Sequence, residues 1–130
     1  MALGHRYNKY HDIKEYQIEN YLVKQIEKLG GIAIKFNPHN NRGLPDRICF
    51  IPGGRVILVE LKRPGQRPRK NQIRQLSFFK KMGFQATWAD TYEKVDKLIE
   101  YIKQWCSEYK VFHVEHLCLR RDCPLRRQRK

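Results

Sequence analysis

Three ionisable side chains fall in two stretches of sequence that otherwise have the apolar character of buried β-strands. Asp46 stands at the start of the first stretch, and Glu60 and Lys62 stand at the end of the second, VILVELK. A charged group in a core strand costs several kcal/mol unless it is paired or bound to a metal ion. Some partner must therefore compensate these charges.

The spacing of the two stretches predicts where the carboxylates lie relative to each other. The stretches flank Pro52-Gly53-Gly54, which is typical of a β-hairpin turn. If all three residues form the connection, Asp46 lies directly across from Glu60, and Lys62 points to the same face. A two-residue turn would place the two carboxylates on opposite faces.

Two facing carboxylates, with Cβ atoms about 5 Å apart, repel each other unless a cation lies between them. Oxygen ligands at that spacing suit Mg²⁺ or Mn²⁺ rather than zinc. Such an ion polarises a phosphate oxygen and lowers the pKa of a bound water. Lys62 would orient that water or stabilise the charge developing on the phosphorane. The alternative is a purely structural salt bridge between Asp46, Glu60 and Lys62.

Charge identifies the class of partner. The chain has 130 residues, with 27 Lys and Arg against 13 Asp and Glu, for a formal net charge of +14. Such an excess favours a polyanion, because Lys and Arg that neutralise phosphates release counterions. The sequence has neither an apolar run long enough for a membrane span nor a secretory signal. We therefore expect a cytoplasmic protein that does not enter a membrane.

The hydrophobic pattern predicts the elements that hold these residues. The expected elements are a helix over 13–29, strands over 32–36, 46–51 and 55–61, a helix over 71–82, a strand over 84–89, and a helix capped by Thr91. This α-β-β-β-α-β-α order predicts an α/β fold with a mixed four-stranded sheet flanked by helices. We expect an N-terminal arm over 1–12, the domain over 13–104, and a basic C-terminal appendage over 105–130.

The chain resembles a known nuclease superfamily. Pro45-Asp46 followed fourteen residues later by Glu60-Leu61-Lys62 resembles the PD-(D/E)xK motif. More narrowly, the chain is similar to the VRR-NUC family between residues 15 and 102. The features that match are Gly30-Gly31, Lys35-Phe36, Arg42 to Arg47, Gly53-Gly54, Val59 to Lys62, the basic loop, the helix with Gln72, and Lys81 to Phe84.

This resemblance implies a restriction-endonuclease-like fold and further site residues. The implied metal ligands are Asp46, Glu60, Glu19 and the backbone carbonyl of Leu61. Glu15 lies one helical turn from Glu19 on nearly the same face and competes for this role. Gln72 would position Lys62 or the phosphate, and Gln75 is the nearby alternative.

Basic residues cluster next to the predicted site. No acidic residue interrupts the stretch from Lys62 to Arg74, which would hold the nucleic-acid backbone without reading its sequence. The predicted phosphate contacts are Arg42, Arg63, Arg67, Arg69, Lys70 and Arg74. Arg47 has the opposite strand parity to Asp46 and is expected to support the fold. A solvated charge run is the alternative for the loop.

The tail has two interpretations. It carries Cys106, His113, His116, Cys118 and Cys123, whose spacing matches no established zinc motif. Packing of a short element with Phe112, Val114, Leu117 and Leu119 against a neighbour or a second subunit is the favoured alternative to zinc binding.

The resemblance also suggests a substrate. Stand-alone members of the family are often phage-encoded and are expected to act as homodimers on branched DNA such as four-way (Holliday) junctions, because two symmetric sites suit two symmetric cuts. A flap, fork or general endonuclease with the same site is one alternative. A non-catalytic DNA-binding module is another, and an RNA substrate is the least favoured.

Overall fold

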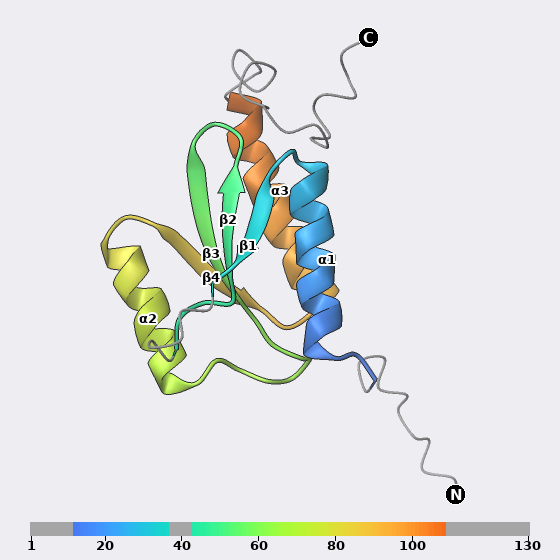
Figure 1. The fold of residues 1–130 in the computed structure, drawn as a ribbon, viewed down its shortest axis with the longest axis vertical. Helices are drawn as coiled ribbons and strands as arrows, with labels where there is room; N and C mark the ends of the chain where they lie inside the picture. Colours follow the sequence, from blue (N-terminus) through green and yellow to red (C-terminus); the bar gives the residue numbers. More distant parts are fainter. Residues whose placement is uncertain (1–11, 37–42, 109–130) are drawn as a thin grey trace, which may run out of the picture.

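One sheet organises the part of the chain that the computed structural model describes, which is residues 12–36 and 43–108 (Figure 1). The elements are α1 (Glu15–Lys28), β1 (Ile32–Lys35), β2 (Arg47–Ile51), β3 (Arg55–Leu61), α2 (Lys70–Lys81), β4 (Gln85–Ala89) and α3 (Tyr92–Glu108). The four strands lie in the order β1-β2-β3-β4. β1, β2 and β3 pair antiparallel, whereas β4 pairs parallel to β3. The predicted mixed sheet and element order are confirmed.

The hairpin between β2 and β3 has the register that a three-residue connection requires. Ile51 pairs with Arg55, and Arg47 pairs with Val59. Two residues of the connection have left-handed backbone angles, with φ of 96° at Gly53 and 78° at Gly54, which glycine adopts without strain. Extending this pairing by one residue, to the position before Arg47, places Asp46 opposite Glu60.

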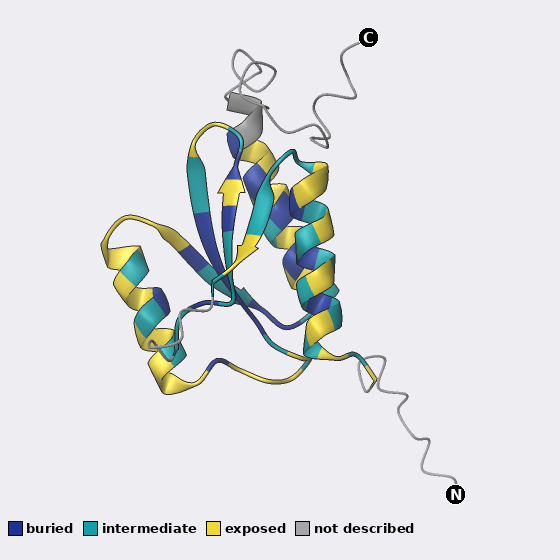
Figure 2. Cartoon of the chain, in the orientation of Figure 1, coloured by how far each residue is buried: buried dark blue, intermediate teal, exposed yellow. Residues whose placement is uncertain are grey.

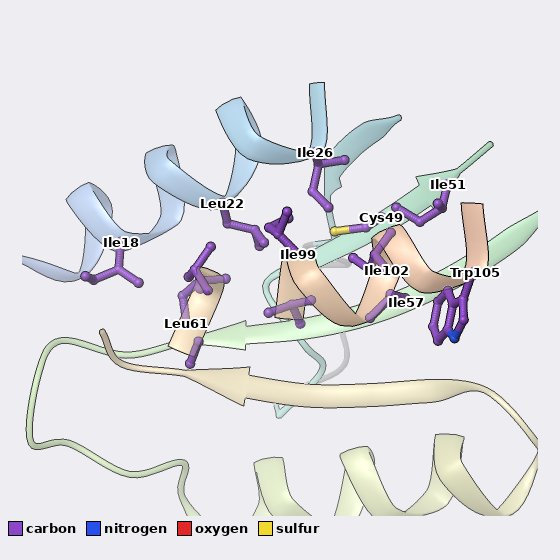
Figure 3. Close-up of a cluster of buried hydrophobic side chains, with 13 residues drawn as sticks. Ile18, Leu22, Ile26, Cys49, Ile51, Ile57, Leu61, Ile99, Ile102 and Trp105 are labelled. Carbon is purple, nitrogen blue, oxygen red and sulfur yellow. The ribbon is translucent and has the colours of Figure 1, made fainter. Parts of the chain in front are cut away.

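The two longest helices cover one face of the sheet. α1 and α3 lie side by side on that face (Figure 1). Figure 3 shows their apolar stripes meeting the inner residues of β2 and β3. The fully buried side chains include Ile18, Leu22 and Ile26 of α1 and Ile102 of α3. This core fixes α1, and with it the N-terminal turn that lies near the ends of the strands.

The domain extends further along α3 than we expected. The appendage was expected to start at residue 105, yet this position falls inside α3, which continues to Glu108. Trp105 is 8% exposed and belongs to the core because it continues the stripe of Val95, Ile99 and Ile102. The guanidinium of Arg55 lies 4.8 Å from the centroid of the Trp105 ring. A position three residues after Ile102 lies on the same helical face, which explains the burial.

α2 covers the opposite face on the side of β4. Leu76 of α2 packs with Leu58 and Ala86 in a second buried cluster. The strand between the two layers, β3, is buried from Ile57 to Leu61, as Figure 2 shows by its dark band. Both helices that flank the site, α1 and α2, have their first turns at the end of the sheet where β3 finishes (Figure 1). Among the described residues, no helix has the length and apolar character that a membrane crossing needs.

Some predicted features lie outside the described residues. These are the N-terminal arm up to residue 11, Arg42, and the Cys and His residues of the tail after residue 108.

Candidate active site

The structure brings the three predicted residues together where β3 ends. Asp46 directly precedes β2, and its Oδ2 accepts a hydrogen bond of 2.8 Å from the backbone N–H of Leu61. Glu60 is the penultimate residue of β3, and its Oε1 lies 3.0 Å from Nζ of Lys62. The hairpin register therefore produces the predicted grouping of two carboxylates and an ammonium group.

Glu60 is held through only one of its two oxygens. Its side chain is 1% exposed, and Oε1 also accepts a hydrogen bond of 2.6 Å from Nε2 of Gln72. Oε2 is buried and has no hydrogen-bond partner among the described residues. A buried charged oxygen without a partner is costly, and such groups in native proteins commonly mark the place of an ion or a water.

Burial raises the proton affinity of both carboxyl groups. Burial, followed by the nearby charge of Asp46, raises the pKa of Glu60 to about 7, against the opposing effect of Lys62. Burial also raises the pKa of Asp46, while the Leu61 N–H bond acts in the opposite direction. At neutral pH the two carboxyl groups therefore bind either a proton or a cation between them.

Two glutamates of α1 approach this pair. Glu19 Oε1 accepts a hydrogen bond of 2.8 Å from Nε of Arg47 and lies 3.8 Å from Nζ of Lys35. Arg47 also donates to the carbonyl of Ala33 at 3.2 Å, so it supports the fold as its strand parity predicts. Burial and then the charge of Asp46 raise the pKa of Glu15. The charge of Glu19 is thus balanced by Arg47, whereas Glu15 lies near the charges of both Asp46 and Lys62.

Gln72 is the α2 glutamine that reaches the site. It is the third residue of α2, and its Oε1 accepts a hydrogen bond of 2.8 Å from the backbone N–H of Arg69, which stabilises the start of the helix. Its Nε2 is then directed at Glu60. One amide therefore couples the position of α2 to the carboxylate at the end of β3.

The chain between β3 and α2, together with the first turns of α2, presents a row of cations beside this site. Its predicted contacts are exposed to solvent, and these are Arg63, Arg67, Arg69, Lys70 and Arg74. No group of three or more His, Cys, Asp or Glu side chains arranged to hold a metal ion occurs in 12–36 and 43–108. The arrangement consists of a carboxylate pair, a lysine and an arginine-rich border, which is suited to chemistry on a phosphate group.

One buried carboxylate near the site was not predicted from the sequence. Asp90 follows β4 and is 7% exposed. Its place just before Thr91 predicts an ordinary acidic residue near a helix N-terminus. The only signal in the sequence is that Asp90 ends an apolar strand, as Glu60 does.

Comparisons with known proteins agree with this geometry. A model of the VRR-NUC domain matches residues 14–92. The protein named "Putative nuclease p44" of Acyrthosiphon pisum secondary endosymbiont phage 1 is 40% identical over 79 residues, which are 61% of this chain and 85% of the relative. A solved structure described as a VRR_NUC domain has a TM-score of 0.63 and 31% identity, and the match covers 67% of this chain and 95% of that one.

Proposed function

The chain belongs to the VRR-NUC domain family and is a nuclease, and from this premise we propose that it hydrolyses phosphodiester bonds in DNA with Mg²⁺ or Mn²⁺. The observation that carries the proposal is the buried, partnerless Oε2 of Glu60 beside Asp46. Burying Glu60 beside the half-buried Asp46, next to an exposed arginine row, has no benefit for folding. It has a clear benefit if a cation and a phosphate group meet there.

The donor set fits a divalent cation that prefers oxygen ligands. Asp46, Glu60 and the backbone carbonyl of Leu61 would hold the ion. A glutamate of α1 would complete the set by turning its side chain toward the ion, since no three carboxylates are already gathered there among the described residues. We favour Glu15 over the expected Glu19 for this place, because Glu19 already pairs with Arg47. When bound, the cation would supply Lewis-acid activation of the phosphate and of a water molecule.

The remaining side chains have roles that follow from their contacts. Lys62 carries a positive charge at the carboxylate pair, 3.0 Å from Glu60, where it would stabilise charge on the phosphate oxygens in the transition state. Gln72 fixes the orientation of Glu60 through the 2.6 Å hydrogen bond. Arg63, Arg67 and the other exposed cations would contact neighbouring phosphates.

The substrate structure is a second level of the proposal. Resemblance to stand-alone family members supports branched DNA, such as a four-way junction, cut by a homodimer with two symmetric sites. Flap, fork or general duplex cleavage by the same site is the alternative. A non-catalytic DNA-binding module is disfavoured, because binding alone needs no buried carboxylates beside a phosphate.

Replacing the aspartate tests the catalytic proposal. Asp46→Asn should keep DNA binding within about threefold, or tighten it, while cleavage in Mg²⁺ or Mn²⁺ falls by at least about 100-fold. Glu100→Gln is the matched control, because it removes one negative charge at an exposed position of α3, where Glu100 pairs with Lys103 at 2.9 Å. Cleavage by Asp46→Asn at the wild-type rate would contradict the site.

Substrate choice needs a separate comparison. Cleavage rates on a four-way junction, a flap and a linear duplex of the same sequence would be measured with Mg²⁺ and with EDTA. A mass measurement in solution would determine the subunit count. Equal rates on all three substrates would refute junction selectivity and leave the nuclease proposal intact.

A further inference from the structure

Asp90 is a buried carboxylate that the proposed catalytic chemistry does not use. It directly follows β4 and is 7% exposed. Its Oδ2 accepts a hydrogen bond of 3.2 Å from the backbone N–H of Gly65, and its Oδ1 lies 2.7 Å from Nζ of Lys94. A buried aspartate with these two partners joins the end of β4 to the arginine-rich chain between β3 and α2.

The segment that Asp90 contacts is a tight turn. The backbone N–H of Gln66 donates to the carbonyl of Arg63 at 3.0 Å, and Gly65 has a φ of 86°. Proline at the second position and a left-handed glycine at the third are typical of a type II turn, which Arg63-Pro64-Gly65-Gln66 has. With its amide oxygen turned toward Arg63, the Gln66 side chain accepts from Nε at 3.0 Å and from Nη2 at 3.1 Å.

The end of β4 holds this turn at two points. The carbonyl of Ala89 accepts a hydrogen bond of 2.9 Å from the backbone N–H of Lys62, and Asp90 accepts from Gly65. Arg63 therefore lies between two anchored residues. Lys94, which neutralises Asp90, also lies 4.0 Å from the ring centroid of Trp88 in β4. The anchor is thus itself fixed by the sheet.

We propose that Asp90 is a positioning residue for substrate binding, which holds the Arg63–Gln66 turn so that Arg63 meets a phosphate next to the reacting one. The inference rests on the proposed nuclease function. A loop that is ordered before binding loses less conformational freedom when the substrate arrives. The carboxylate of Asp90 stabilises the turn through the N–H of Gly65. Removing this acceptor should make Arg63 more mobile and leave Lys62 in place, because Lys62 is bonded to Ala89.

The test compares two substitutions of Asp90. Asp90→Ala removes the acceptor, whereas Asp90→Asn keeps an oxygen for the Gly65 N–H. We expect Asp90→Ala to raise KM and the metal-free Kd for a linear duplex about tenfold, with kcat within about twofold. The slope of log Kd against log salt should fall by up to about 0.9, the value for one lost phosphate contact. Asp90→Asn should stay within about twofold of wild type.

Glu100→Ala is the matched control, since it also removes one negative charge from the chain and breaks an exposed ion pair of α3. Gly65→Ala perturbs the same turn independently. Its Cβ would meet nothing within 4 Å, so its cost comes only from the left-handed backbone. If Asp90→Ala and Gly65→Ala both act through the turn, the variant that carries the two together should bind DNA about as weakly as the single variant with the lower affinity.

Hydrogen exchange gives a readout without DNA. The Gly65 amide should be protected in wild type and Asp90→Asn, and should exchange at least about tenfold faster in Asp90→Ala. Equal Kd, KM and salt slope for wild type and Asp90→Ala would overturn the inference alone, even if Asp90→Ala is less stable. A wild-type chain that neither binds nor cuts DNA would overturn the proposed function and the inference with it.

Discussion

Without metal, Glu60→Gln should be stabilised relative to wild type, and this stabilisation should be larger at pH 8 than at pH 5. The pKa of Glu60 is raised from 4.5 to about 7 by burial and by Asp46. Between these two values the folded protein binds a proton that the unfolded chain does not. The free energy of unfolding of wild type therefore falls as pH rises through this window.

The magnitude follows from the pKa. Each tenfold difference in proton affinity corresponds to about 1.4 kcal/mol. The raised pKa of Glu60 therefore costs the folded state about 3 kcal/mol at pH 8 and about 1 kcal/mol at pH 5. Glutamine at this position keeps an oxygen for the Gln72 amide and never ionises. The stability of Glu60→Gln relative to wild type should thus increase by about 2 kcal/mol between pH 5 and pH 8.

Urea unfolding at both pH values in EDTA measures this difference. Taking the variant relative to wild type cancels the pH dependence of other groups. Adding Mg²⁺ at tenfold above its Kd should stabilise wild type at pH 8 by about 1.4 kcal/mol and leave the variant unchanged. A relative stability that is the same at pH 5 and pH 8, within about 0.5 kcal/mol, would refute the reasoning from burial.

Three further substitutions test other parts of the structure. Glu15→Gln should weaken Mg²⁺ binding, measured by calorimetry, more than Glu19→Gln does. Glu19→Gln should instead lower the free energy of unfolding by about 1 kcal/mol, because its charge-assisted bond to Arg47 is lost. The reverse order of Mg²⁺ affinities would assign the ligand to Glu19. Gly31→Ala should destabilise the domain by about 1–3 kcal/mol in thermal unfolding, since its Cβ would lie 2.6 Å from the carbonyl oxygen of Phe50; an unchanged melting temperature would contradict this close approach.

The sequence predicts most of the fold because its signals are local. Apolar periodicity identifies the helices and strands, and the length of the Pro52-Gly53-Gly54 connection determines the register of β2 and β3. Errors occur at the ends of elements, where periodicity fades. Trp105 is the clearest example, since the basic composition that follows it suggested an appendage while its own side chain completes the core.

The site is predictable to the extent that strand alternation determines it. Alternation places Asp46, Glu60 and Lys62 on one face, and the structure has them together. It says nothing about contacts between separate elements. The choice between Glu15 and Glu19 depends on which of them meets Arg47, and the role of Asp90 depends on a turn 25 residues earlier in the chain. Such contacts follow from packing and not from spacing.

The arrangement at Glu60 favours a nuclease site over a structural salt bridge. A salt bridge that served only the fold would satisfy both oxygens of a carboxylate as deeply buried as this one. Here Lys62 and Gln72 both bind Oε1, and Oε2 has no partner among the described residues. Asp46 adds a second carboxyl group nearby, which raises the pKa of Glu60 further. Two donors on one oxygen and none on the other fix the carboxylate in place and leave one oxygen for a cation, which is the property that catalysis needs and folding does not.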